Sequence, residues 1–424
     1  MSKYVIVGGS AGGIGAVEAI REVDPVGTIT VISEETFPQY SRPMIADYLS
    51  GEAALERMKY RDDHFWEKNR VQTLTGRRAV SLDLDERCVE LDGGDKISFE
   101  KLLIATGGKP IIPKIEGGDK DGVFTFTDLS NAEGLAAELE KGKRAVVIGG
   151  GLIGVSVAEA LVKREMKVTI VELKDRILNL ILDAATSDIV EKVIREAGVS
   201  IVTGRTVQRV LGRRDDDNAV GGVVLANDEE IPCDLVVIAI GVVPRTELIV
   251  GTEVKVKRGI IVDRFMRTNV PDVYACGDVA EAYDFVLDGN RLLPLWPVAH
   301  LGGRVAGYNM VGKKTEYQGG TVMSALKYFD IPIISAGITT SESDSYEVLI
   351  DHRPERKLYK KIVLKNNVIV GMTFVGDIEK AGIIFHFMKN RVNVREFKQG
   401  LISENFGLVT LPASLRKKLF MVGN

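Results

Sequence analysis

The sequence predicts an α/β protein in which two strand–glycine-turn–helix–strand units precede a smaller α+β region. Two apolar runs, Tyr4–Val7 and Arg144–Ile148, each break into a glycine cluster that is followed by residues with helical spacing. In both units a further apolar run ends at an acidic residue. Residues 333–375 then alternate in the way that is typical of antiparallel strands.

Composition limits the possible classes of function. The chain has 424 residues, of which 45% are hydrophobic and 27% charged, as in a globular protein of about two to three domains. A net charge of −4 gives no reason to expect nucleic acid or an anionic membrane as the main partner. No apolar leader precedes the first strand, and the apolar window Leu235–Val243 is far shorter than the ~20 residues of a membrane span. The chain has only three cysteines, which fits a reducing cytoplasm: Cys88, Cys233 and Cys276. They are far apart in sequence and form no C-x-x-C or C-x₄-C pair, so neither a metal site nor a local redox disulfide is expected.

The first unit is organised around the glycine cluster Gly8–Gly13. Gly8 permits a tight turn, Gly13 lets helix and strand pack closely, and the N-terminus of the helix offers free N–H groups to a pyrophosphate. Ser10 stands where the middle glycine of G-x-G-x-x-G is usual, so the motif taken alone is weak. The unit comprises strands at Tyr4–Val7 and Thr28–Ile32, a helix over Ile14–Ile20 and the acidic end Ser33-Glu34-Glu35.

The second unit is complete. Gly149–Gly154 carries all three glycines between an apolar strand and a helix expected over Val155–Lys163. The next strand, Lys167–Val171, ends at Glu172, 23 positions beyond Gly149. A carboxylate at that distance can reach the hydroxyls of an adenosine ribose. This combination is a specific signal for a dinucleotide site.

The remaining elements follow in order from turn residues and apolar periodicity. A charged stretch, Arg213–Asp217, is expected to be a solvated hairpin turn. The expected strands are Val80–Leu84, Cys88–Leu91, Lys101–Ile104, Leu235–Gly241, and those near 333–337, 346–350, 358–364 and 368–375. A short helix is expected to begin at Met44. Further helices are expected over Asp183–Ala197, Leu301–Met310 and Gly382–Lys389.

Two dinucleotide units in one chain indicate electron transfer between two dinucleotides, since a nicotinamide delivers a hydride and a flavin accepts it. The chain resembles the two-dinucleotide flavoprotein (pyridine nucleotide–disulfide oxidoreductase) family over essentially its whole length. The motifs that carry the resemblance occur in the family's order: Gly8–Gly13, Ala105-Thr106-Gly107, Gly149–Gly154 and Tyr274-Ala275-Cys276-Gly277-Asp278.

The resemblance implies two Rossmann-like dinucleotide-binding domains and a smaller α+β C-terminal interface domain that usually forms a homodimer. The implied segments are 1–113 and 246–320 for FAD, 114–245 for NAD(H), and 321–424 for the interface domain. It implies that Asp278 holds the ribityl chain of FAD and that Glu34 binds the ribose, with its neighbours Glu35 and Ser33 as open alternatives.

The resemblance also implies the cofactor contacts, whereas it implies no catalytic side chain because the flavin itself carries the chemistry. For FAD the residues are Gly8, Gly9, Ser10, Ala11, Gly12, Gly13, Glu34, Glu35, Ser41, Arg42, Pro43, Ala79, Ala105, Thr106, Gly107, Gly277, Asp278, Trp296, Pro297 and Ala299. For NAD they are Gly149, Gly151, Leu152, Ile153, Gly154, Glu172 and Gly241.

The absence of a cysteine narrows the branch of the family. The loop Tyr40–Met44 holds no cysteine, and no C-x₄-C pair follows the first helix, so thiol chemistry at the flavin is not expected. The sequence Tyr40-Ser41-Arg42-Pro43, together with Pro294-Leu295-Trp296-Pro297, resembles rubredoxin reductases, the flavin domain of nitrite reductases and ferredoxin-linked NAD(P)H oxidoreductases. Two residues depart from common family patterns: Ser156, where many relatives have Glu, and Asp47, where ferredoxin reductases of oxygenase systems often have Lys.

The expected function is therefore that of a cytoplasmic FAD-dependent NAD(P)H oxidoreductase that exchanges single electrons with an iron–sulfur, rubredoxin-like or ferredoxin-like partner. Glu172 would repel a 2′-phosphate and favours NAD over NADP, although Lys174 and Arg176 lie close by in sequence. One alternative is an NADH oxidase or diaphorase that reduces O₂ or small acceptors. A second is an NADH-responsive flavoprotein that acts through partner binding.

Overall fold

The computed structural model describes residues 2–139, 144–340, 344–413 and 415–417. The chain divides into two compact units. Unit 1 contains Met1–Lys114, Phe124–Lys141 and Ala239–Gly320, and unit 2 contains Ile115–Val123, Gly142–Ile238 and Thr321–Asn424. Residues 140–143, 341–343, 414 and 418–424, which fall within the predicted domains, lie outside the described residues. The domain bounds inferred from the sequence stay a prediction.

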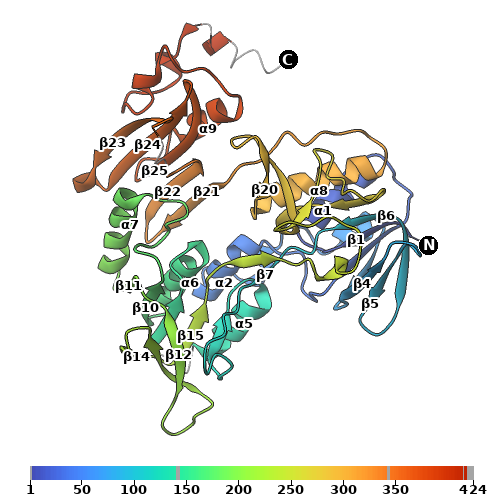
Figure 1. Cartoon of the computed structure of the whole chain (residues 1–424), viewed down its shortest axis with the longest axis horizontal. Helices are drawn as coiled ribbons and strands as arrows, with labels where there is room; N and C mark the ends of the chain where they lie inside the picture. The colour runs from blue at the N-terminus through green and yellow to red at the C-terminus, as the bar shows by residue number, and fades with distance from the viewer. Residues whose placement is uncertain (1, 140–143, 341–343, 414, 418–424) are drawn as a thin grey trace. The chain divides into compact units, whose positions relative to one another are not determined.

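The main sheet of unit 1 has the strand order β3-β2-β1-β6-β5-β4, and β18 also pairs with β6 (Figure 1). β1, β2, β3 and β18 run parallel to their neighbours, whereas β4, β5 and the first half of β6 form an antiparallel ribbon. The central strand β1 is fully buried at Val5 and Ile6. The core around it includes residues of α1, such as Val17, and of the β4–β5 ribbon, such as Val89. The bounds are β1 Ser2–Val7, β2 Ile29–Ser33, β3 Val71–Thr75, β4 Ala79–Asp83, β5 Cys88–Leu91, β6 Lys96–Ile104 and β18 Val273–Ala275.

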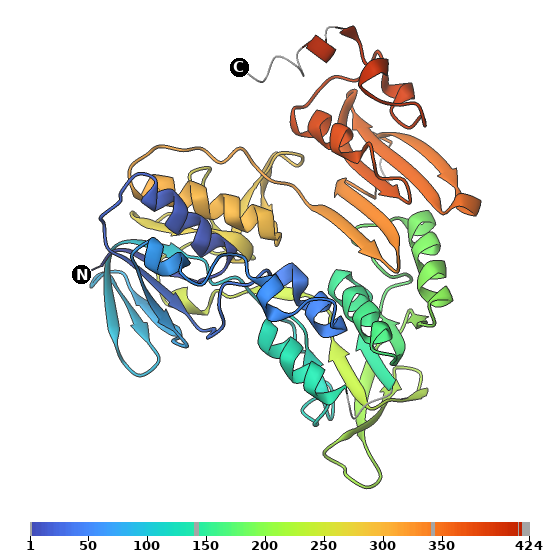
Figure 2. The ribbon, with the colours of Figure 1, turned by 180° about the vertical axis from the view of Figure 1, so that it is seen from behind.

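Two helices of unit 1, α1 (Ala11–Arg21) and α8 (Trp296–Met310), lie side by side in both views (Figures 1 and 2). Glycines allow this close packing: a Cβ on Gly303 would lie 1.9 Å from the carbonyl oxygen of Gly12. The start of α8 is thereby held against the first glycine cluster. Smaller elements of the unit are α2 Ile45–Ser50, α3 Leu55–Met58, α4 Phe65–Lys68, α5 Leu129–Glu138, β7 Gly108–Pro110, β16 Val242–Pro244, β17 Ile260–Ile261, β19 Ala280–Asp284 and β20 Gly289–Leu292.

A second sheet has the order β11-β10-β9-β15-β8, and its parallel strands β9, β10, β11 and β15 lie in unit 2. Helix α6 (Leu152–Lys163) connects β9 to β10, which makes the second strand–helix–strand unit. The strands are β8 Val123–Thr125, β9 Arg144–Ile148, β10 Lys167–Glu172, β11 Ser200–Thr203 and β15 Leu235–Ile238, with the antiparallel ribbon β12 Val207–Gly212, β13 Val220–Leu225 and β14 Glu230–Pro232. The charged stretch 213–217 joins β12 to β13, as predicted.

Unit 2 also contains the C-terminal antiparallel sheet, with the order β21-β22-β25-β24-β23. Helix α7 (Ala184–Glu196) lies beside this sheet in Figures 1 and 2, and α9 (Ala381–Lys389) packs on β25. The strands are β21 Met323–Tyr328, β22 Ile331–Gly337, β23 Glu347–Arg353, β24 Leu358–Lys365 and β25 Val368–Val375.

Several predicted element bounds were wrong: α1 begins at Ala11 rather than Ile14, β6 begins at Lys96 rather than Lys101, and β15 ends at Ile238 rather than Gly241. Helix α8 begins at Trp296 rather than Leu301, because Pro297 occupies the second helical position, where a missing N–H costs nothing. Helix α6 begins at Leu152, directly after the third loop glycine, and not at Val155. Strand β21 was not predicted, since Met323–Tyr328 contains no β-branched residue. No helix among the described residues is both long and apolar enough to cross a membrane.

Candidate functional site

The first glycine cluster connects β1 to α1 through a backbone that only glycine can adopt. Gly8 has φ +120°, and a Cβ on it would lie 2.1 Å from the carbonyl oxygen of Ala105. A Cβ on Gly13 would lie 2.0 Å from the carbonyl oxygen of Gly8. The Ser10 side chain makes no capping hydrogen bond to α1. The first N–H groups of the helix therefore remain available to an anionic ligand.

The second cluster repeats this geometry in unit 2. Gly149 has φ +108°, and a Cβ on Gly154 would lie 1.9 Å from the carbonyl oxygen of Gly149. Around Gly151, the N-cap of α6, a Cβ would meet no heavy atom within 4 Å. The middle glycine thus faces open space at a helix N-terminus, which is the geometry that a pyrophosphate requires. Both clusters fit a dinucleotide, and Leu152 and Ile153 continue the second one into the first turn of α6.

Glu172 ends β10 and lies beside the second cluster, where the sequence predicts it. Its Oε2 accepts a hydrogen bond from the Gly150 N–H at 2.6 Å, and its Oε1 accepts one from the Lys174 N–H at 2.7 Å. The side chain is buried. The carboxylate therefore ties the glycine loop to the segment that follows β10, a role that the sequence does not reveal.

The two acids after β2 have different partners. Glu34 accepts a hydrogen bond from Arg245 Nη1 at 2.5 Å on an exposed surface. Glu35 forms an ion pair with Arg42 and accepts a hydrogen bond from the Tyr40 hydroxyl at 2.8 Å. Glu35 therefore orients the loop that carries Arg42. The Glu34 side chain is the more exposed of the two carboxylates.

The loop Ser41-Arg42-Pro43 is held to unit 1 from several directions. The Ser41 N–H donates to the Met58 carbonyl at 2.7 Å, and Pro43 lies in a short 3₁₀ turn, Arg42–Met44. Arg42 Nη1 donates to the Thr127 carbonyl at 2.9 Å. The guanidinium is thus fixed in place and can face an anionic or polar ligand.

The segment after β18 meets the first cluster and α8. A Cβ on Gly12 would lie 2.8 Å from Cys276 Sγ and 3.5 Å from the Ala299 carbonyl oxygen. Gly277, with φ +76°, has Ala299 Cβ within 3.3 Å of where its own Cβ would be. Burial raises the pKa of Asp278, and the charge of Arg42 partly opposes this shift. These predicted FAD residues are therefore brought together in space.

Two further predicted residues lie at the end of β6. Thr106 donates its hydroxyl to the Arg245 carbonyl at 2.7 Å, and Gly107 has φ +73° with open space around it. Ala79 lies in β4, opposite Leu91 of β5. Strand β4 belongs to the same sheet as β1, the strand that precedes the first cluster. Gly241, with φ +113°, belongs to unit 1, whereas the other predicted NAD residues belong to unit 2.

Trp296 begins α8 beside an aromatic and charged cluster that the sequence does not reveal. Its ring packs edge-on against Tyr60, with 5.2 Å between the ring centroids. The Tyr60 hydroxyl lies 3.3 Å from His300 Nδ1, and His300 Nε2 lies 3.5 Å from a Glu18 carboxylate oxygen. Burial lowers the pKa of His300. His300 lies within α8, just after Pro297 and Ala299, and its ring is held by neighbouring side chains.

The three cysteines are buried and free. Burial raises the pKa of the Cys276 thiol to about 12, which favours the neutral thiol over the thiolate at neutral pH. Among the described residues, no group of three or more His, Cys, Asp or Glu side chains could hold a metal ion.

We expect Cys276→Ala to keep its FAD and to be reduced by NADH within about twofold of the wild-type rate constant, because a buried neutral thiol only fills space. Stopped-flow flavin absorbance measures this rate. A variant that retains FAD but loses more than about tenfold in rate would show that the thiol takes part in the chemistry.

Two glycine loops of matching geometry at the N-termini of α1 and α6 define a class: an α/β protein built to bind two dinucleotides. The chain belongs to the pyridine nucleotide-disulphide oxidoreductase family, whose pattern matches residues 2–303. Residues 323–392 match the Rubredoxin NAD+ reductase C-terminal domain. The chain is an oxidoreductase of this family, with FAD and a nicotinamide nucleotide as cofactors.

Two curated relatives are similar over nearly the whole chain. The NADH-dependent phenylglyoxylate dehydrogenase subunit epsilon of Aromatoleum evansii is 31% identical over 406 residues, which cover 95% of each protein. The nitrite reductase [NAD(P)H] of Bacillus subtilis is 30% identical over 400 residues, 93% of this chain. The chain spans about half of that relative, 48% of its length.

Two solved structures share the fold. The NAD-dependent persulfide reductase from A. fulgidus is 30% identical, with a TM-score of 0.86 over 93% of this chain and 78% of that one. The NADH:rubredoxin oxidoreductase from Clostridium acetobutylicum is 25% identical, with a TM-score of 0.77 over 96% of this chain and 100% of that one.

Proposed function

We propose that the chain transfers reducing equivalents between NADH and a one-electron acceptor of the iron–sulfur or rubredoxin type. The observation that carries this proposal is the pair of glycine loops at helix N-termini together with three buried cysteines, among which burial raises the pKa of Cys276 to about 12. FAD, when bound, supplies a centre that accepts a hydride and releases electrons singly. The match to the Rubredoxin NAD+ reductase C-terminal domain supports a partner of this type.

We assign the FAD site to unit 1. The first glycine cluster would hold the pyrophosphate with its N–H groups, Glu34 would accept from ribose hydroxyls, and Asp278 would hold the ribityl chain. Arg42 is fixed by Glu35 and Thr127, so that it meets the ligand in one orientation. The remaining proposed contacts are Ala79, Ala105, Thr106, Gly107, Gly277, Trp296, Pro297 and Ala299.

We assign the NAD(H) site to unit 2, at Gly149, Gly151, Leu152, Ile153, Gly154 and Glu172, with Gly241 as a further proposed contact. The buried carboxylate of Glu172 lies next to the glycine loop, where it disfavours the extra phosphate of NADPH. NADH is therefore the proposed donor. No side chain has to transfer a proton, because the task of the protein is to position the two rings.

The proposal is tested by reducing the protein with NADH without air and then mixing it with an acceptor. We expect oxidised rubredoxin or a ferredoxin to restore the flavin absorbance faster than air-saturated buffer does. Rapid reoxidation by O₂, with no gain from any iron–sulfur protein, would instead establish an NADH oxidase. Slow reoxidation by every acceptor, with an NADH-dependent change in association, would establish a flavoprotein that acts through partner binding.

Two further features belong to the proposal. A cytoplasmic location is supported by three cysteines that are all buried and unpaired. A homodimer is proposed from the resemblance of residues 321–424 to the interface domain of the family, and sedimentation measures it.

A further inference from the structure

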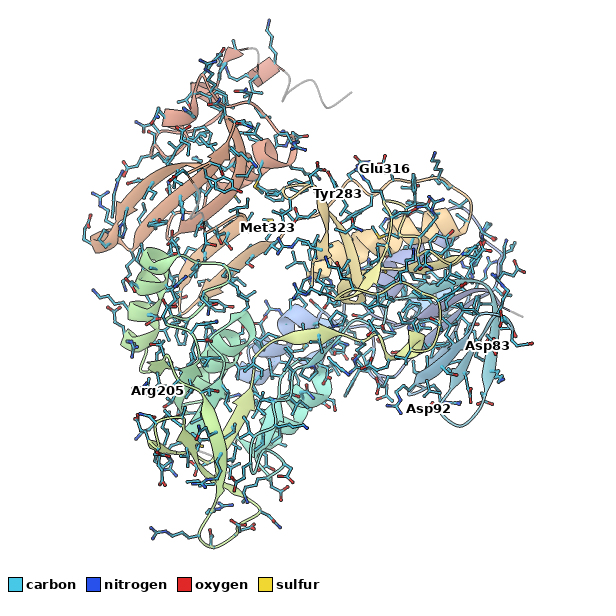
Figure 3. The ribbon with its side chains drawn as sticks, viewed as in Figure 1. Asp83, Asp92, Arg205, Tyr283, Glu316 and Met323 are labelled. Atoms are coloured by element: carbon cyan, nitrogen blue, oxygen red, sulfur yellow. The ribbon has the colours of Figure 1, made fainter. Side chains whose placement is uncertain are left out.

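The C-terminal sheet and the second glycine loop lie in the same compact unit, whereas the first glycine loop lies in the other. Strand β21 packs on α6, the helix that begins at the second glycine loop. Met323, labelled in Figure 3, begins this strand, and Tyr328 ends it. The C-terminal sheet therefore contacts the helix whose N-terminus carries the second glycine loop.

The first contact is made by the Tyr328 hydroxyl. It donates a hydrogen bond to the carbonyl oxygen of Leu152 at 2.9 Å. Leu152 is the first residue of α6 and follows Gly151, the residue that faces open space. The Ser156 hydroxyl donates to the same carbonyl at 2.9 Å and lies 3.4 Å from the Tyr328 oxygen. Tyr328 is only 3% exposed, so water cannot readily replace its bond.

The second contact reaches the loop through α7. Asp183 caps this helix, and its Oδ2 accepts hydrogen bonds from Lys361 Nζ and from the Tyr359 hydroxyl, both of β24 and both at 2.9 Å. Lys361 also donates to the Thr339 carbonyl at 2.9 Å. Because Lys361 is buried, these bonds fix the start of α7 against the sheet.

Helix α7 in turn holds the segment that supports the glycine loop. The Ser187 hydroxyl donates to the Ile177 carbonyl at 2.9 Å, and Glu191 accepts from the Ile177 N–H at 3.2 Å. The next residue, Leu178, donates its N–H to the Gly150 carbonyl at 2.7 Å. The Ile177 side chain lies 2.6 Å from where a Gly150 Cβ would be. The sheet is thus linked to both sides of the loop.

We propose that the C-terminal sheet holds the nicotinamide-binding loop in its binding shape, and that Tyr328 is a positioning residue for NAD(H). This inference rests on the proposed NAD(H) site at Gly149–Gly154. The hydrogen bond to Leu152 fixes the orientation of the turn whose N–H groups face the pyrophosphate. Without that bond, the turn must be ordered when NADH binds, which weakens binding. The FAD loop lies in unit 1 and is not affected.

The test compares Tyr328→Phe with Tyr317→Phe. Both tyrosines are buried, but the Tyr317 hydroxyl has no hydrogen-bond partner among the described residues. For Y328F we expect an NADH dissociation constant about fivefold higher, from the loss of one hydrogen bond. We also expect full FAD content and a limiting rate constant of flavin reduction within about twofold of wild type. Y317F should match wild type in all three quantities.

A Y328F protein whose NADH dissociation constant equals that of Y317F would overturn the inference, whatever its thermal stability. If Y328F does not accumulate as folded protein, Tyr359→Phe tests the second contact, since Lys361 keeps Asp183 paired. It should raise the NADH dissociation constant by about twofold to fivefold, and an unchanged constant would again contradict the inference. Failure of the wild type to bind NADH would instead refute the proposed function.

Discussion

Gly154→Ala is expected to give a protein that retains FAD but is reduced by NADH at least about a hundredfold more slowly than wild type. The added Cβ would lie 1.9 Å from the backbone oxygen of Gly149, so the loop has to move. Gly13→Ala places a Cβ 2.0 Å from the Gly8 oxygen and should have the converse effect, a chain purified without FAD. Flavin content and stopped-flow reduction by NADH measure the two effects.

The matched control is Gly382→Ala in α9, where a Cβ meets no heavy atom within 4 Å and the backbone is helical. This variant should retain both FAD and NADH-driven reduction. If Gly154→Ala loses FAD while Gly13→Ala keeps it, the assignment of the two cofactors to the two loops is reversed. If both variants behave like Gly382→Ala, neither loop contacts a dinucleotide.

Lys361→Met is expected to lower the free energy of unfolding by about 1–3 kcal/mol, because it leaves the half-buried Asp183 carboxylate without its cation. The control is Lys357→Met, which removes an ion pair of similar length, 2.8 Å to Glu196, on the exposed surface. Its expected cost is about 0–1 kcal/mol. Urea unfolding of the two variants measures the difference. Equal stabilities would show that the pair of Lys361 and Asp183 contributes no more than a surface pair.

The effect of pH on Lys361→Met has a defined sign. Burial of Asp183 favours its protonated form, but hydrogen bonds from Lys361 and Thr186 outweigh burial and hold its pKa below the ordinary value of 3.8. The charged carboxylate therefore stabilises the fold above that pH, and this contribution is lost as the pH falls through the folded-state pKa. The stability gap between wild type and Lys361→Met should narrow in acid. A gap that widens in acid would contradict the assignment.

The two glycine loops could be predicted from sequence because each needs glycine for a local reason, namely a positive φ or the close approach of two backbones. The contact from Tyr328 to Leu152 could not, since the two residues are separated by 176 positions and no local pattern links them. The hydrogen bonds that the Glu172 carboxylate accepts from backbone N–H groups could not be predicted either. The sequence shows an acid at the right spacing, but it does not show where the carboxylate oxygens point.

Element ends were predicted less well than element types. The helix predicted from Leu301 in fact begins at Trp296, because Pro297 is favourable in the first turn of a helix. The link between Asp183 and β24 likewise depends on tertiary packing, since a helix cap is recognisable in sequence but the lysine that binds it is not.

In the proposed function, electrons pass from NADH to FAD and then to a partner without the participation of a protein thiol. Anaerobic titration with NADH, followed by flavin absorbance, tests it most directly, because a redox-active disulfide adds its own capacity for electrons. We expect one equivalent of NADH per FAD, about two electrons, to complete the reduction. An uptake of about four electrons per FAD would reveal a redox-active disulfide or thiol centre and would contradict the proposed electron transfer without a protein thiol.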